Sequence, residues 1–412
     1  MTNRSVALTI ALLALPFAAA ADRLAPNTLT GFEQALSASS WFKEAPDSVT
    51  GKPLHPLLAG ASAFATSGVA SVDEVVDVGR RRSYQQMSVS GGVRFPLLGS
   101  RLRYSDGVID RQISELTAAA DQELKRRDLF ARLRRAYVEL WSARVRRQLA
   151  AEYQSTAPEM ESLLLRRTAA AMLLESDRLD FMASFARAAS EYSRAAADEL
   201  SAVAELEALI ETPVATVAPP VVEFACNRPT LDQHPELQVL RARATEYASR
   251  ATATTLRAVR SDLRVGVSSS YEPASGDPGK SAFVTLSFDY AFGDARAERR
   301  AARLQYSRAD SEYRLRRAQL ESELMRLLQA GRALESDHAL ARISAAASAA
   351  RLRERGLRAA RLAGDVIEQL QQARYANYRA TLAEHLATRE QLEWQIALAT
   401  FTPSDCGQSE SP

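Results

Sequence analysis

Two stretches of the chain carry a helical pattern that is much longer than a globular domain needs. The first runs from about 101 to about 167 and the second from about 295 to about 361, with few glycines or prolines in either. Within the first, apolar residues recur at spacings of three and four, as at Leu133, Tyr137 and Leu140, which is typical of a coiled-coil seam. At a rise of ~1.5 Å per residue, each stretch predicts a helix ~100 Å long.

The composition agrees with long helices and argues against several classes of function. The 412 residues include only 17 glycines, well below the usual ~7%. The 52 basic and 50 acidic residues leave a net charge of +2, so charge gives no indication of a nucleic acid partner. The four histidines and two cysteines are scattered along the chain, which argues against a zinc site or a Ser-His-Asp triad. We therefore expect no enzyme, metal site or cofactor.

The first 21 residues are predicted to form a cleaved secretory signal peptide. Arg4 supplies the positive charge, 6–14 is apolar, Pro16 interrupts the run, and the alanines at 18–21 offer an A-x-A cleavage site. An apolar segment of ~9–13 residues is too short to span a bilayer as a helix. No later run of 18 apolar residues exists. The mature chain is therefore expected to be exported and to meet a membrane only as β-structure.

Alternation of apolar and polar residues appears in two places. In the strand predicted at 84–98, the apolar members of the row include Met87, Val89, Val93 and Phe95. In a hairpin predicted at 263–292, the return strand carries Val284, Leu286, Phe288, Tyr290 and Phe292. A period of two is the signature of a strand with one apolar face. The two rows lie roughly 200 positions apart and a long helical pattern follows each, so we interpret the chain as a tandem repeat.

The repeat divides the chain into predicted segments. They are a signal peptide at 1–21, an N-terminal segment of unclear structure at 22–82, a first repeat at 83–212, a linker at 213–232, a second repeat at 233–402 and a tail at 403–412. Before the first repeat, 29–41 fits one short helix and 57–80 has no firm assignment. Each repeat ends in a long helical hairpin, and Ser176 with Asp177 is the expected cap of one of its helices.

The apolar strand faces admit two explanations. A half-buried sheet that packs on a soluble core would show the same alternation. A sheet that faces lipid is the second explanation, because strands of ~9–11 residues can cross hydrocarbon and the remaining sequence offers no other apolar layer. A sheet in lipid cannot leave open edges. One chain offers at most about four strands, whereas the smallest membrane barrels have about eight, so several copies must close one barrel.

Several short motifs resemble those of the TolC-like outer membrane efflux proteins. They are VRFPLLGSR at 93–101, AYVEL at 136–140, HPEL at 234–237, FGDAR at 292–296, AGDVI at 363–367 and LQQAR at 370–374. Their order, spacing and duplication extend over roughly 84–402. Two features depart from the family. The first repeat lacks a clear long ascending helix, and Gln369 and Gln372 stand where family members carry pore-narrowing aspartates.

The resemblance implies a homotrimer that is mainly α with a small β part. Its twelve-stranded transmembrane β-barrel would lie in the outer membrane of a Gram-negative bacterium and continue as an α-helical barrel through the periplasm. The implied function is the passive export of drugs, metals or proteins in a tripartite efflux or type I secretion system, with a periplasmic adaptor and an inner-membrane pump as partners. The alternative is a soluble periplasmic coiled-coil adaptor or scaffold whose sheet packs on its own helices.

Polar residues at the two predicted hairpin tips are the candidate pore residues. One tip carries Gly364, Asp365, Glu368, Gln369 and Gln372, and the other carries Glu175, Asp177 and Asp180. Three copies of such acids at a narrow tunnel end would favour cations. Alternatively, the acids cap helices or occupy their first turns, where the helix dipole favours them. The tips are also where an adaptor is expected to dock, beside Arg355, Arg358 and Arg361.

The two cysteines occupy equivalent places in the repeat. Cys226 lies in the predicted linker and Cys406 in the predicted tail. In an oxidising periplasm they either form a disulfide or remain two free thiols. The sequence leaves both possibilities open.

Overall fold

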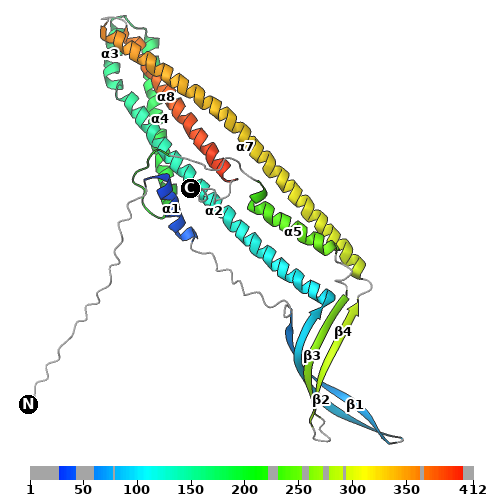
Figure 1. The fold of residues 1–412 in the computed structure, drawn as a ribbon. Coiled ribbons are helices and arrows are strands. Elements are labelled where there is room, and N and C mark those ends of the chain that lie inside the picture. Colours follow the sequence, from blue (N-terminus) through cyan, green and yellow to red (C-terminus); the bar gives the residue numbers. More distant parts are fainter. Residues whose placement is uncertain are drawn as a thin grey trace, which may run out of the picture. The chain divides into compact units, whose positions relative to one another are not determined.

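The computed structural model describes residues 27–42, 60–77, 79–220, 231–252, 259–271, 278–290, 294–361 and 366–401. Within these residues the chain is mostly helical, with one antiparallel sheet of four strands (Figure 1). The predicted class, mainly α with a small β part, is therefore confirmed. None of the helices described is both long and apolar enough to cross a membrane.

The chain forms two compact units, and each gathers segments that are far apart in the sequence. Unit 1 consists of Met1–Glu44, Phe130–Glu223 and Leu334–Glu393. Unit 2 consists of Ala45–Leu129, Phe224–Ala333 and Trp394–Pro412. Each unit thus contains segments from both predicted repeats.

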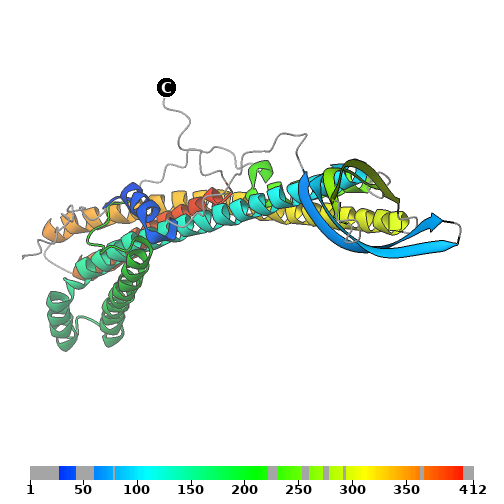
Figure 2. The same ribbon diagram turned by 90° about the horizontal axis from the view of Figure 1, so that it is seen from below.

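The sheet belongs to unit 2 and has the strand order β1-β2-β3-β4, with all neighbours antiparallel. Its strands are β1 (Ser62–Asp77), β2 (Arg80–Leu97), β3 (Val259–Tyr271) and β4 (Pro278–Tyr290). β1 lies in the segment that the sequence left unassigned. The described part of the chain thus forms four strands, and they bend along their length (Figure 2).

The strand-to-helix junction is direct, because β2 ends at Leu97 and α2 (Leu98–Gln154) begins at the next residue. Leu98 takes a positive φ of 37°, a conformation that is uncommon outside glycine. The neighbouring strand is tied to the same turn, since the Ser261 amide donates to Ser100 Oγ at 3.1 Å. The sheet and the first turns of α2 are thus held together without a loop.

The helix predicted over 101–167 is not continuous. α2 ends at Gln154, and a separate helix, α3 (Ala157–Ala169), starts after a short turn with Pro158 in its first turn. Proline lacks the amide hydrogen and clashes with the preceding turn, so it fits the start of a helix but not its interior. The expected cap of α4 (Glu175–Ile210) is also wrong, because Leu174 occupies the N-cap position without a side-chain hydrogen bond.

The core of unit 1 forms where the predicted coiled-coil seam meets the N-terminal segment. Leu133, Tyr137 and Leu140 are fully buried. The short helix expected near 29–41 is present as α1 (Leu29–Ala38), followed by η1 (Ser40–Phe42). The Phe32 ring of α1 meets the Tyr137 ring edge-on at 5.2 Å. The Tyr137 hydroxyl donates to the Ala218 carbonyl at 2.7 Å, which satisfies its polar group inside the core.

The helices of unit 2 pack through a second core. The elements around this core are η2 (Leu231–Gln233), α5 (Pro235–Thr252), the first part of α7 (Asp294–Arg361) and the end of α8 (Val366–Ala399). Leu237 of α5 is buried with Leu320 of α7. Arg316 donates to both carboxylate oxygens of Glu236 at 2.8 Å. The Trp394 indole of α8 donates to the Leu327 carbonyl of α7 at 2.7 Å.

Two glycines of α7 are expected to respond in opposite directions to alanine. A Cβ atom at Gly331 would lie 2.2 Å from the Trp394 ring, whereas one at Gly356 would meet nothing within 4 Å. We expect Gly331→Ala to lower the free energy of unfolding by about 1–3 kcal/mol through overpacking. Gly356→Ala should raise it by about 0.5–1 kcal/mol, because alanine is the better helix former. Urea titration of both variants in detergent tests this, and equal shifts would contradict it.

Candidate functional site

The two faces of the sheet differ sharply in chemistry, and one of them is apolar and exposed. Pairing register places Val93, Val265 and Val284 side by side on three strands. Their exposed fractions are 40%, 41% and 70%. The other exposed large apolar residues of this face are Val69, Met87, Val89, Val267, Tyr271, Leu286, Phe288 and Tyr290. We call this set of side chains the apolar face.

The apolar face includes most of the side chains that the sequence placed on lipid-facing strands. Those exposed are Met87, Val89, Val93, Val284, Leu286, Phe288 and Tyr290. Phe95 is only partly exposed, and Phe292 lies outside the described residues. Soluble monomers rarely expose contiguous apolar patches of this kind. The face is therefore the strongest candidate for an interaction surface in unit 2.

Among the residues that the structure describes, the two outer strands of the sheet, β1 and β4, have open edges. In the described part of the chain, β1 pairs only with β2 and β4 pairs only with β3. A strand at a sheet edge presents a row of unpaired amide and carbonyl groups, which is a template for another strand. The apolar face thus ends on both sides in backbone groups that can pair with a further chain.

The opposite face of the sheet is lined by hydroxyl groups, and we call it the polar face. Thr66 Oγ1 lies 2.6 Å from Ser90 Oγ, and Ser268 Oγ lies 2.7 Å from Ser281 Oγ. Strand pairing places these four residues in one row across the sheet. Hydroxyl pairs of this kind stabilise neighbouring strands while they keep the surface wettable.

The next row of the polar face interrupts the hydroxyls with aromatic rings. It consists of Phe64, Gly92, Gly266 and Phe283, one from each strand in order. The two ring centroids are 6.2 Å apart although they belong to the two outer strands. At this distance the two rings touch each other, because neither glycine places a side chain between them. Sequence reasoning missed this pair because Phe64 lies in the unassigned segment and pairs only through the fold.

A charged row follows the aromatic row on the polar face. Arg94 and Arg264 stand directly opposite each other on β2 and β3. Arg94 forms an ion pair with Asp262, whose side chain is almost fully buried. The Arg264 guanidinium lies 6.0 Å from the centroid of the Phe64 ring. Asp262 therefore offsets the charge of one arginine, while the other lies over an aromatic face.

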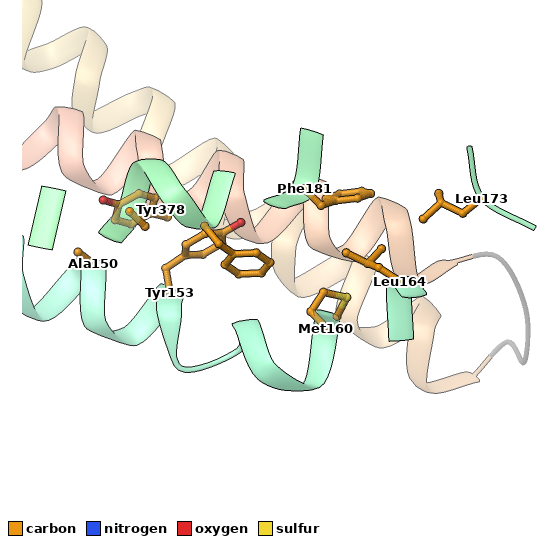
Figure 3. Close-up of a cluster of buried hydrophobic side chains, with 9 residues drawn as sticks. Ala150, Tyr153, Met160, Leu164, Leu173, Phe181 and Tyr378 are labelled. Carbon is orange, nitrogen blue, oxygen red and sulfur yellow. The ribbon is translucent and has the colours of Figure 1, made fainter. Parts of the chain in front are cut away.

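Unit 1 holds an aromatic cluster where α2, α4 and α8 meet (Figure 3). The Tyr153 ring stacks with Phe185 at 5.0 Å and with Tyr378 at 5.1 Å. The Tyr153 and Ser184 hydroxyls are 2.7 Å apart. Burial raises the pKa of Tyr378 to about 12. Stacked rings of this size fix the spacing of the three helices close to α3.

The predicted tip residues of α4 lie in its first two turns and are exposed. Glu175 forms an ion pair with Arg178, three residues along the same helix. That contact, a hydrogen bond from Arg178, lowers the pKa of Glu175. Asp177 and Asp180 are also exposed. The first-turn position of Glu175 and Asp177 agrees with the helix-dipole explanation.

Part of the second predicted tip can be placed at the start of α8. Glu368 lies in the first turn of the helix, 3.5 Å from Arg167 of α3. Gln369 and Gln372 are exposed. Gly364 and Asp365 lie outside the described residues, as do Cys226 and Cys406. The acidic pore ring and the disulfide both stay predictions.

A histidine is buried in unit 1, where the sequence indicated no site. His385 Nε2 lies 3.1 Å from Ser142 Oγ, and its ring is 4.5 Å from the Trp141 ring. Burial, with smaller contributions from Arg146 and Arg389, lowers the pKa of His385 to about 4, and the hydrogen bond with Ser142 only partly opposes this shift. The ring is therefore neutral in the folded chain at neutral pH.

We expect His385 to make the fold less stable in mild acid. The unfolded chain protonates this histidine below about pH 6.5, whereas the folded chain does so only near about pH 4, so stability falls as pH falls through that window. The loss contributed by this residue should reach about 3 kcal/mol. His385→Gln removes the titration. The difference in urea midpoint between the two proteins should therefore change between pH 7 and pH 4.5, and a constant difference would contradict the argument.

Comparison with known proteins identifies the fold. No family model matches the sequence, and no curated protein matches it. The open state of the MtrE outer membrane channel of Neisseria gonorrhoeae matches with a TM-score of 0.61 at 18% identity, covering 84% of this chain and 80% of that one. The CmeC outer membrane channel of Campylobacter jejuni matches with a TM-score of 0.60 at 13% identity, covering 83% and 77%.

The outer membrane protein VceC of Vibrio cholerae matches over the greater part of both chains. Its TM-score is 0.61 at 11% identity, with 90% of this chain and 89% of that chain covered. At these identities the likeness is one of fold. The chain has the fold of the outer membrane channels, and the resemblance to TolC-like proteins predicted from the sequence is confirmed at that level.

Proposed function

We propose that the chain is the outer membrane channel of a tripartite efflux or type I secretion system. In this role it is a passive conduit for drugs, metals or proteins that an inner-membrane pump delivers. The observation that carries the proposal is the exposed apolar face on a sheet with two open edges. A soluble adaptor whose sheet packs on its own helices would bury that face. The fold shared with MtrE and CmeC supports the same conclusion.

The dimensions of the apolar face fit a membrane. β3 runs from Val259 to Tyr271, a path of ~40 Å at ~3.3 Å per residue. With the ~40° tilt of strands in membrane barrels, the strand rises ~30 Å, which matches the hydrocarbon thickness. Tyr271 lies at one end of the face and Tyr290 at the other. Aromatic residues at both ends are typical of the two interfaces of a barrel wall.

The open edges require more than one copy. Unpaired backbone groups in hydrocarbon cost several kcal/mol each, so β1 and β4 must pair with strands of neighbouring chains. The resemblance to TolC-like proteins sets the number at three, and three chains of four strands give a twelve-stranded barrel. The homotrimer places the apolar face against lipid and the polar face around the lumen. The helices then extend the channel into the periplasm of a Gram-negative bacterium.

The periplasmic adaptor is proposed to dock where α3 and α4 meet. Met172, Leu174 and Leu179 are exposed there, with exposed fractions between 53% and 70%. Asp177 and Asp180 add negative charge to the same end. Glu175 and Glu368 contribute less, because Arg178 and Arg167 partly neutralise them. An apolar surface with a charged border is the usual composition of a transient protein interface.

Membrane fractionation combined with native mass spectrometry tests the proposal. A channel is expected to sediment with the outer membrane, to need detergent for extraction and to appear as a trimer. Recovery as a soluble monomer would instead favour the periplasmic adaptor. A detergent-soluble species with another number of copies would support the membrane role and contradict the twelve-stranded barrel.

A further inference from the structure

We propose that the polar face of the sheet carries a binding site for aromatic anions, formed by Phe64, Phe283 and Arg264. The inference rests on the proposed function, which makes this face the lining of the channel. It goes further by naming a class of solute that the sheet-side end of the channel would bind. Three copies of the chain would place three such sites around the lumen.

The two phenyl rings touch each other above a glycine floor, and we call them the aromatic pair. Phe64 and Phe283 are both partly exposed, with an angle of 52° between their planes. A Cβ atom at Gly92 would lie 2.2 Å from the Val265 carbonyl oxygen, and one at Gly266 would lie 2.5 Å from the Gly91 carbonyl oxygen and 3.0 Å from Phe283 Cζ. No larger residue fits either position without a shift of the sheet. The rings therefore lie directly on the backbone, and their partly exposed outer sides are the surface that a ligand can reach.

Packing alone does not account for the composition of this surface. A phenyl ring often covers a glycine in a neighbouring strand, which stabilises a curved sheet. This explains why a ring lies beside each glycine. It does not explain Arg94 and Arg264, which stand directly opposite each other on paired strands. Like charges in such positions are destabilising, and the carboxylate of Asp262 offsets only one of the two. Residues that violate such a local rule are expected at functional sites.

The charge beside the aromatic pair is positive. Arg94 is paired with the carboxylate of Asp262. Arg264 is exposed, and its guanidinium lies over the Phe64 ring at 6.0 Å. Attraction to the ring face leaves the hydrogen-bond donors of a guanidinium available to an anion. The row that borders the aromatic pair thus carries two arginines, and the carboxylate of Asp262 lies one row further from the rings.

These features together select the ligand. A planar apolar ring can contact both phenyl groups by edge or offset packing. A sulfonate, carboxylate or phosphate on that ring then reaches Arg264, which binds such groups through two parallel hydrogen bonds. The hydroxyl row of Thr66, Ser90, Ser268 and Ser281 lies on the other side of the aromatic pair and accommodates polar substituents. Simple inorganic anions have no apolar ring to pack on the phenyl groups, and aromatic cations are repelled by the positive charge of Arg264.

Single-channel recording of the full trimer in planar bilayers tests the site. Naphthalenesulfonate is added on the side of the β1–β2 turn, with ethanesulfonate as the anion that lacks a ring. Naphthalenesulfonate is expected to block the current in a saturable manner at concentrations where ethanesulfonate has no effect. The double variant Phe64→Leu/Phe283→Leu keeps apolar bulk but removes the rings. It should raise the apparent dissociation constant about fivefold or more, as should Arg264→Gln.

The matched control is Phe288→Leu, because Phe288 lies on the apolar face of the same sheet. It should leave the block unchanged. Two results would overturn the site while the proposed function stands. In both the channels open normally, and naphthalenesulfonate either blocks all variants equally or does not block the wild type. If the purified protein forms no channels at all, both proposals are overturned. Thermal melting of each trimer verifies that the variants are folded.

Discussion

Replacing Val284 by lysine is expected to prevent stable assembly of the chain in the outer membrane. Val284 is 70% exposed in the centre of the apolar face. A lysine at the midplane of a membrane barrel costs about 2–4 kcal/mol, and a trimer would bear that cost three times. The expected result is a strong loss of the trimer from outer membrane fractions, with the chain degraded or recovered elsewhere. The measurement is the amount of trimer in unheated detergent gels.

The control for this variant is Ser281→Lys on the same strand. Ser281 lies on the polar face, where it contacts the Ser268 hydroxyl. A lysine there would project into water, and only the hydroxyl contact, worth about 1 kcal/mol, is lost. The trimer should therefore persist in Ser281→Lys. If both lysine variants assemble equally well, the apolar face does not contact lipid, and the channel proposal fails with it.

The second large effect is expected from Arg146→Met in unit 1. The Arg146 side chain is only 8% exposed and pairs with Glu139, Glu191 and Asp198 at 3.2, 3.2 and 2.6 Å. Removing one partner from a buried ionic network leaves unpaired charges behind, which costs about 3–5 kcal/mol. We expect a fall of this size in the free energy of unfolding, measured by urea titration in detergent at about pH 8.

The effect of Arg146→Met should depend on pH in a defined direction. Burial raises the pKa of Glu139, while Arg389 and Arg146 lower it. Without Arg146 the pKa rises further, so the folded variant takes up protons more readily than the unfolded chain as pH falls. The stability deficit should therefore shrink between about pH 8 and pH 5. A deficit that grows in acid would contradict the explanation.

Arg147→Met is the matched control, one residue further along α2. Arg147 pairs with Glu199 at 2.6 Å, but its side chain is 42% exposed. An exposed ion pair contributes at most about 1 kcal/mol. A large fall in the free energy of unfolding of Arg147→Met would show that losing any arginine from this stretch of α2 is destabilising. The effect of Arg146→Met could then not be assigned to the buried network.

Features with a local cause could be predicted from the sequence. Alternation at Met87–Phe95 and Val284–Tyr290 predicted strands with one apolar side, because the direction of a side chain from a strand depends only on residue parity. The seam at Leu133, Tyr137 and Leu140 predicted buried positions in the same way, because the 3.6-residue period of a helix decides which side chains share one face. Pro158 also carried a local signal, and reading it as the start of a new helix would have placed the break between α2 and α3.

Features that depend on partners distant in the sequence could not be predicted. β1 has small or polar residues such as Ala63, Ala65 and Ser67 on its apolar side, so its own pattern is weak, and pairing with β2 defines it. The Phe64–Phe283 pair and the Arg94–Asp262 ion pair join residues whose strands meet only in the folded sheet. The buried surroundings of His385 and Arg146 likewise come from α2, α4 and α8 together.

The sequence by itself determined the long helices, the apolar strand row and the likeness to TolC-like proteins, because periodicity and short motifs are written in neighbouring residues. The tertiary structure decided that this row is exposed and that four strands share its face. It also decided that a pair of phenyl rings with an arginine beside it lies on the other face. Exposure and cross-strand contact are properties of pairs of segments. Their free energies arise only when the chain brings those segments together.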